Sequence, residues 1–194
     1  MSADLRNIPL GDLTVDDAGR PPRPDLGAVT PSQRQPGKHL AAIHRHYLME
    51  MGRIAQVLRR IEAGDTPPAE LKSIVLNADM TKNFRAFGTI CGQECRVLTM
   101  HHDIEEQSIF PQLHASGSEA VRAIVDRLRA EHLVVHELLE RLAAVADDLD
   151  RTPDAESFAQ AGAIFDKLWE VVKSHFHYEE TTLEEALGYY GVMV

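Results

Sequence analysis

The stretch MHHDIEEQSIFP, from Met100 to Pro111, places two histidines and two glutamates in a segment that otherwise has the pattern of a buried helix. Successive residues of an α-helix are rotated by about 100°, so these four side chains cannot all face the same way. An ionised glutamate in a core is costly unless it has a partner. If one histidine and one glutamate point inward together, the stretch predicts a metal site.

The sequence around this stretch indicates long helices separated by short breaks that contain Gly and Pro. We predict four of them, at about Lys38–Glu62, Thr81–Leu113, Ser118–Asp150 and Asp154–Leu187. A short helical piece is expected over 69–77, and Pro111 is expected to bend or end the second long helix. No segment has a strand pattern, so the predicted fold class is all-α, an up-and-down four-helix bundle.

The first 36 residues differ from the rest of the chain. They contain six of the ten prolines and show no lasting periodicity, so residues 1–36 are predicted to form a Pro-rich N-terminal arm. The arm is either disordered or lies across the bundle, with apolar residues to bury at Ile8, Leu10, Leu13 and Val15. Residues 37–194 are predicted to form the bundle.

Composition narrows the class of protein. A chain of 194 residues suits one domain, and 20 Lys and Arg against 30 Asp and Glu give a net charge of −10. This charge disfavours nucleic acid and membrane surfaces as partners. The sequence has no long apolar run and no secretory pattern at its start, so we expect a cytoplasmic protein. The oligomeric state is left open.

The two cysteines, Cys91 and Cys95, lie one helical turn apart. This spacing suits a disulfide poorly, so both are predicted to be reduced. They fill the core as small apolar residues or, as the alternative, have a redox or metal-binding role.

Projecting each predicted helix around the centre of its apolar stripe shows which polar side chains face the core. Those within about 40° of a stripe centre are His44, Glu105, His132, His175 and Glu179. Those farther away are Glu106 and His136, at about 80°, and His39, His46, His177 and Glu180, beyond about 120°. We therefore predict that Glu106, His177 and Glu180 face solvent and that His136 is a flank residue able to reach inward.

The projection leaves His101 and His102 open, because they lie on opposite sides of the stripe that contains Glu105. We prefer His101, which stands one turn before Glu105 at i−4. Measured along the helices, the inward polar residues all come to one layer of the bundle.

Four imidazoles and two carboxylates in one layer amount to about three ligands for each of two metal ions. Such mixed donors favour iron, with manganese and zinc as alternatives. The open positions would accept water, an oxo or hydroxo bridge, and O2, hydrogen peroxide or nitric oxide. Tyr47 lies about 40° from the centre of its stripe and either contacts this site or packs in the core.

Four motifs carry these residues: AIHRHYLMEM, HHDIEEQSIFPQL, AEHLVVHELLERL and SHFHYEETTLEEAL. Together they resemble the hemerythrin family, more narrowly the bacterial hemerythrin-like proteins with an HHE cation-binding domain, over about residues 38–187. The resemblance implies a four-helix bundle with a non-haem diiron centre. Its implied iron ligands are His44, His101, Glu105, His132, His175 and Glu179.

In oxygen-carrying hemerythrins a further histidine ligand stands where this chain has His136. The chain departs from those carriers in a longer spacing between Glu105 and His132 and in its N-terminal arm. Because six ligands leave open positions, we expect turnover of O2, hydrogen peroxide or nitric oxide, such as a catalase-like activity. A fifth histidine ligand would favour reversible O2 binding instead.

Two other functions compete with this hypothesis. The chain could be a non-enzymatic iron or oxygen sensor, in which metal occupancy changes the fold. It could also be a structural bundle, although that hypothesis leaves two buried glutamates unexplained.

Overall fold

The computed structural model describes residues 5–65, 92–151 and 155–194, and within these residues the chain is helical and contains no strand. The all-α prediction is therefore confirmed. The long helices and their continuations are α1 (Gln35–Glu62), α4 (Gly92–Ile104), a π-helical turn η4 (Glu105–Ile109), α5 (Phe110–Ser116), α6 (Glu119–Arg151) and α7 (Ala155–Tyr189). Two short 3-10 helices precede them, η1 (Leu10–Asp12) and η2 (Asp17–Gly19).

Some predictions fall on parts of the chain that are not described. The short helix expected over 69–77, the start of the second long helix at 81–91, and Cys91 lie outside the described residues. The count of four helices and the division at residue 36 stay predictions.

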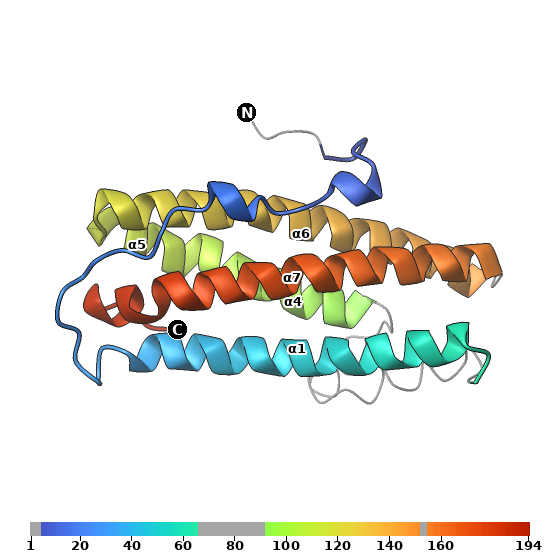
Figure 1. Ribbon diagram of the computed structural model, residues 1–194, viewed down its shortest axis with the longest axis horizontal. Helices are drawn as coiled ribbons and strands as arrows, with labels where there is room; N and C mark the ends of the chain where they lie inside the picture. The colour runs from blue at the N-terminus through green and yellow to red at the C-terminus, as the bar shows by residue number, and fades with distance from the viewer. Residues whose placement is uncertain (1–4, 66–91, 152–154) are drawn as a thin grey trace.

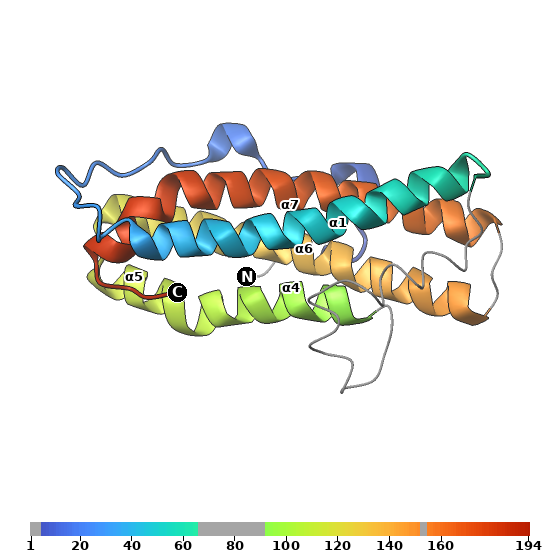
Figure 2. The same cartoon turned by 90° about the horizontal axis from the view of Figure 1, so that it is seen from below.

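The long helices lie side by side (Figures 1 and 2), and α7 packs against both α1 and α6. Helix α4 packs against α6, and the colour gradient in Figure 1 shows that α1 and α6 run in one direction while α4 and α7 run in the other. No helix among the described residues is long and apolar enough to cross a membrane.

Helix α1 begins at Gln35, three residues before the predicted start at Lys38. Pro36 thus lies in the first turn of the helix, where its missing N–H breaks no hydrogen bond. A Cβ atom at Gly37 would collide with the backbone of Glu184 in α7, so glycine lets the two helices approach closely at this point.

The helix that contains the quoted stretch changes its winding immediately after Ile104. Phe110 N–H donates to the Glu105 carbonyl, five residues back, which makes one π turn. Pro111 follows in the first turn of α5, and the helix continues to Ser116. Pro111 therefore does not end the helix, and a local widening precedes it.

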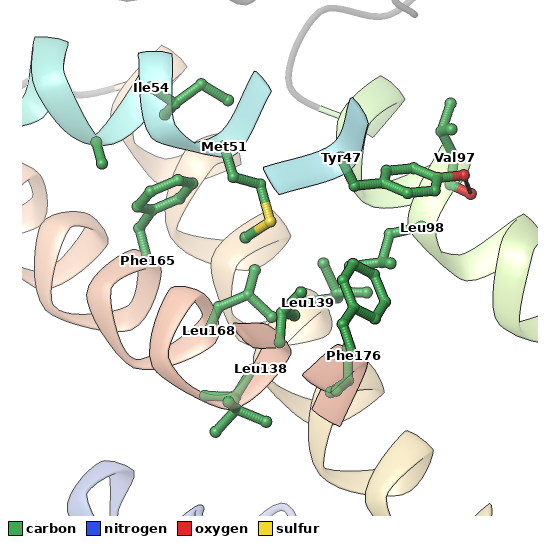
Figure 3. Packing of buried hydrophobic residues seen from close by; sticks show 14 of the residues in the cluster. Tyr47, Met51, Ile54, Val97, Leu98, Leu138, Leu139, Phe165, Leu168 and Phe176 are labelled. Atoms are coloured by element: carbon green, nitrogen blue, oxygen red, sulfur yellow. Dashed lines mark hydrogen bonds between the residues drawn. The ribbon is translucent and has the colours of Figure 1, made fainter. Parts of the chain in front are cut away.

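Buried apolar side chains among the described residues form three clusters, two of them large. The first includes Tyr47, Leu98, Val135, Phe165 and Leu168, many of which are drawn in Figure 3, and the second includes Leu40, Ile109, Leu113, Leu128 and Leu183. Along α1 and α6 the inward histidine stands between the residues of the first large cluster and those of the second. Along α7, His175 lies where the first cluster ends at Phe176 and the second begins at Tyr178. A layer of polar side chains thus separates the two large clusters.

The N-terminal segment, residues 5–34, lies along the outside of α6 and α7 (Figure 1). Leu13 is fully buried in the first cluster, and Ile8, Leu10 and Val15 pack against the same cluster. Of the two alternatives for these residues, the structure shows packing across the bundle. About 25 cal/mol is gained for each Å² of apolar surface buried in this way.

Candidate metal centre

Seven buried side chains in the polar layer form two groups, and within each group the potential ligand atoms lie within 4.8 Å of one another. Group A contains His44 of α1, His101 of α4, Glu105 of η4 and Glu179 of α7. Group B contains His102 of α4, His132 of α6 and His175 of α7. Each group therefore draws its members from three or more segments of the chain.

In group A, the imidazole nitrogens and the carboxylates point at one another. His44 Nε2 lies 3.0 Å from His101 Nε2 and 3.6 Å from Glu179 Oε2. His101 Nε2 lies 3.2 Å from Glu105 Oε1. A metal ion is a common acceptor for such converging lone pairs.

The carboxylates of group A also reach group B. Glu105 Oε2 lies 3.4 Å from His132 Nε2, and Glu179 Oε2 lies 3.9 Å from His175 Nε2. Both glutamates therefore stand at the boundary of the two groups, where one carboxylate can offer oxygens to two cations.

The unpaired atoms of this layer fit metal ions. All four carboxylate oxygens of Glu105 and Glu179, and the Nε2 atoms of His102, His132 and His175, are buried without a hydrogen-bond partner. Such atoms are costly unless something satisfies them. Cations bound between these nitrogens and oxygens would satisfy every one of them.

The electrostatics of the layer agree with this fit. Burial and the neighbouring charge of Glu179 raise the pKa of Glu105 well above its usual value. Burial, together with the nearby His44 and His175, lowers the pKa of His101 to about 3. His101 thus presents a neutral imidazole lone pair, and Glu105 needs nearby positive charge to ionise.

A second layer of carboxylates orients three of the five histidines. His44 Nδ1 donates to Glu180 at 3.1 Å, and His132 Nδ1 donates to Glu106 at 2.9 Å. An ionised carboxylate only accepts hydrogen bonds, so each Nδ1 carries the proton and each Nε2 keeps its lone pair.

The third such contact is the hydrogen bond from His175 Nδ1 to Glu131 Oε2, at 3.1 Å. All three glutamates act between helices: Glu106 of η4 holds a histidine of α6, Glu131 of α6 holds one of α7, and Glu180 of α7 holds one of α1. The second layer therefore ties the helices together as well as orienting the rings.

The prediction that Glu106 and Glu180 face solvent is corrected. Their side chains are only 30% exposed, and each accepts a hydrogen bond from a histidine. For Glu131, which accepts a hydrogen bond from His175, no role was predicted from the sequence. The sequence did contain a signal, because each of these glutamates is adjacent to a predicted inward residue and so lies about 100° away, toward the next helix.

The structure uses both of the adjacent histidines that the projection left open. His101 joins group A and His102 joins group B. Because the two lie on opposite sides of the Glu105 stripe, one turns toward α1 and the other toward α6. The preferred set of six therefore omits His102, which is stacked on His132 with ring centroids 4.0 Å apart.

Two further candidates lie beside the groups but outside them. His136 Nε2 is 3.2 Å from His102 Nδ1, so it supports another histidine from behind. The Tyr47 hydroxyl donates to the Val97 carbonyl at 3.1 Å, while its ring packs 5.3 Å from that of His101. His39 and His177 are exposed, as predicted, and His46 is half-buried.

Comparison with known proteins identifies the family. The family model described as the hemerythrin HHE cation-binding domain matches residues 35–187. No curated protein and no solved structure gave a significant match. The matched residues include all of groups A and B, and the chain belongs to the hemerythrin HHE cation-binding domain family.

Proposed function

We propose that this chain is a non-haem diiron protein that holds one iron ion at group A and one at group B, with Glu105 and Glu179 shared between them. The observation that carries the proposal is the set of unpaired, buried atoms that converge from both groups. Imidazole and carboxylate together suit iron better than zinc, which favours thiolates and imidazoles in closed tetrahedral sites.

The two groups offer different numbers of protein ligands. Two histidines and an oxygen from each glutamate would serve the ion at group A. Three histidines and the same glutamates would serve the ion at group B. Group A therefore leaves more positions open, and we propose that a small ligand binds there.

Bound iron supplies open coordination positions and one-electron chemistry for O2, hydrogen peroxide or nitric oxide. The protein orients and shields this chemistry. Phe176 is stacked on His44 with ring centroids 3.8 Å apart, and the ring of Tyr47 packs against His101. These rings cover His44 and His101 with apolar surface, which would disfavour charged metabolites beside group A.

The presence of His102 in group B affects the choice between reversible O2 binding and turnover of a small oxidant. Six ligands leave at least one further position open, which favours turnover, whereas a fifth histidine would fill that position. His102, and not His136, lies in group B and would supply the fifth histidine. This observation supports the alternative function of an O2-binding or oxygen-sensing protein.

The test begins with iron analysis of the purified protein and its visible spectrum with azide, hydrogen peroxide and nitric oxide. We expect two irons per chain and charge-transfer bands that change with each ligand. The protein is then reduced without oxygen, exposed to O2 and returned to an oxygen-free atmosphere. Consumption of peroxide with oxidation that cannot be reversed supports turnover, and repeated spectral reversal supports carriage. Protein that binds no iron would overturn the proposal.

A further inference from the structure

The N-terminal segment reaches the second layer of the metal centre through Arg20. Arg20 follows η2 and donates from Nε to Glu131 Oε1 at 2.8 Å and from Nη2 to Glu131 Oε2 at 2.9 Å. Glu131 Oε2 also accepts the hydrogen bond from His175 Nδ1. One carboxylate thus joins the N-terminal segment to a histidine of group B.

Arg20 is itself held on several sides. Its Nη1 donates to Ser174 Oγ at 2.9 Å, and Ser174 in turn donates to Asp17. The guanidinium lies 4.6 Å from the centre of the Tyr178 ring, whose hydroxyl donates to the Pro21 carbonyl. The side chain is only 10% exposed. A guanidinium fixed in this way holds its partner in a single geometry.

Glu131 is enclosed by donors, because it accepts two hydrogen bonds from Arg20 and one from His175. Arg127 contributes a further contact, 3.1 Å from Nε to Glu131 Oε1, and also donates to the Asp16 carbonyl. Glu131 is 2% exposed, so protein groups take the place of water around it.

We infer that Arg20 is a positioning residue of the metal centre, which fixes the ring of His175 through Glu131 and so makes the N-terminal segment part of the site. The inference rests on the proposed function, because it assumes that His175 Nε2 binds a metal ion. Without the two-pronged contact, Glu131 is free to turn away, and the imidazole of His175 loses its fixed orientation. Removal of a hydrogen-bond partner that orients a metal-binding histidine typically lowers metal affinity by about 10- to 100-fold.

Arg23 offers a matched control within the same segment. It also pairs with a glutamate of α7, Glu185, but its side chain is 52% exposed. Arg23→Gln therefore removes an arginine and an ion pair between the segment and α7 while leaving Arg20 and Glu131 in place. Arg20→Lys keeps the charge at position 20 but cannot form the two parallel hydrogen bonds.

The first measurement uses Co²⁺ as a spectroscopic probe. Wild type and the variants Arg20→Gln, Arg20→Lys and Arg23→Gln are loaded with two equivalents, and the visible bands are followed after a chelator is added. We expect one of the two ions to leave Arg20→Gln at least about tenfold faster than wild type. Arg23→Gln should match wild type, and Arg20→Lys should release that ion faster than wild type does.

The second measurement needs no metal. In protein with ¹⁵N-labelled histidine, the Nδ1–H signal of His175 is assigned by its loss in His175→Ala. In Arg20→Gln we expect this signal to shift and its proton to exchange faster with water, while the corresponding signals of His44 and His132 stay in place.

Several outcomes overturn the inference. One is an unchanged His175 signal with unchanged Co²⁺ release, and another is equal effects of Arg20→Gln and Arg23→Gln, which would indicate general loosening of the segment. Wild-type release from Arg20→Lys would show that charge alone is needed. A wild-type chain that binds no Co²⁺ or iron overturns the proposed function as well, whereas normal binding with an unaffected Arg20→Gln overturns only this inference.

Discussion

Groups A and B lie side by side in one layer, yet they differ in composition. Group A has two histidines and the carboxylates of Glu105 and Glu179, whereas group B has three histidines and receives carboxylate oxygens only across the boundary. If both groups bind cations as proposed, group B would hold its ion with more protein ligands, and group A would leave room for an additional ligand. The comparison therefore predicts different roles for the two ions.

The support behind the two groups differs as well. In group B, His132 and His175 are held by Glu106 and Glu131, and an arginine pairs with each of these glutamates, Arg129 at 3.0 Å and Arg20 at 2.8 Å. In group A, His44 is held by Glu180, which is as exposed as Glu106 but has no arginine partner among the described residues. Group B is thus the more firmly preorganised of the two.

Removing both ions should have the largest effect. Metal that binds only the folded state stabilises it, by about 2.7 kcal/mol when free metal is 100-fold above its Kd. For a chain of this size we expect the melting temperature to fall by at least about 5 °C. Calorimetry before and after chelation, with metal removal confirmed by elemental analysis, measures the change. An identical melting temperature would mean that the layer gains nothing from cations.

The next largest effect is expected from a residue that serves both groups. Glu179→Ala removes a carboxylate that lies between them, so both ions should be lost and the protein should retain less than half of the wild-type iron. His177→Ala, on an exposed face of the same helix, should retain all of it. Equal iron loss in the two variants would show that the shared position of Glu179 is unimportant.

His102→Ala separates the two groups. It removes one histidine from B and none from A, so we expect about one iron per chain, with the ion at A retained. His136→Ala is the control, since His136 contacts His102 but belongs to neither group, and it should keep both ions. Two tightly bound irons in His102→Ala would mean that His102 is not a ligand and that His101 is the only histidine of α4 that binds iron.

The smallest effect is expected from the support of group A. Glu180→Gln weakens the hold on the Nδ1–H of His44, so the ion at A should be bound about 10- to 100-fold less tightly, while the ion at B is unaffected. Competition with a chelator measures both affinities. The helix projection places Glu180 in solvent and therefore predicts no effect of this substitution. If Glu180→Gln binds metal as tightly as wild type, the hydrogen bond between His44 and Glu180 does not support the metal site.

Much of this arrangement could be predicted because helical periodicity fixes the direction of each side chain relative to its own helix. Inward positions for His44, Glu105, His132, His175 and Glu179 follow from that rule, and the structure brings all of them into groups A and B. Their role as ligands, like that of His101, stays a prediction that the variants above test. The all-α class follows from the same periodicity.

The sequence by itself thus determined that His44, Glu105, His132, His175 and Glu179 enter the polar layer, because periodicity depends only on the local winding of the chain. Only the tertiary structure decided how those side chains are shared out. His101 turns toward α1 and His102 toward α6. Glu106 and Glu180 accept hydrogen bonds from histidines of other helices. The physical reason is that a side chain at the edge of a helical stripe can face solvent or another helix, and packing alone decides which.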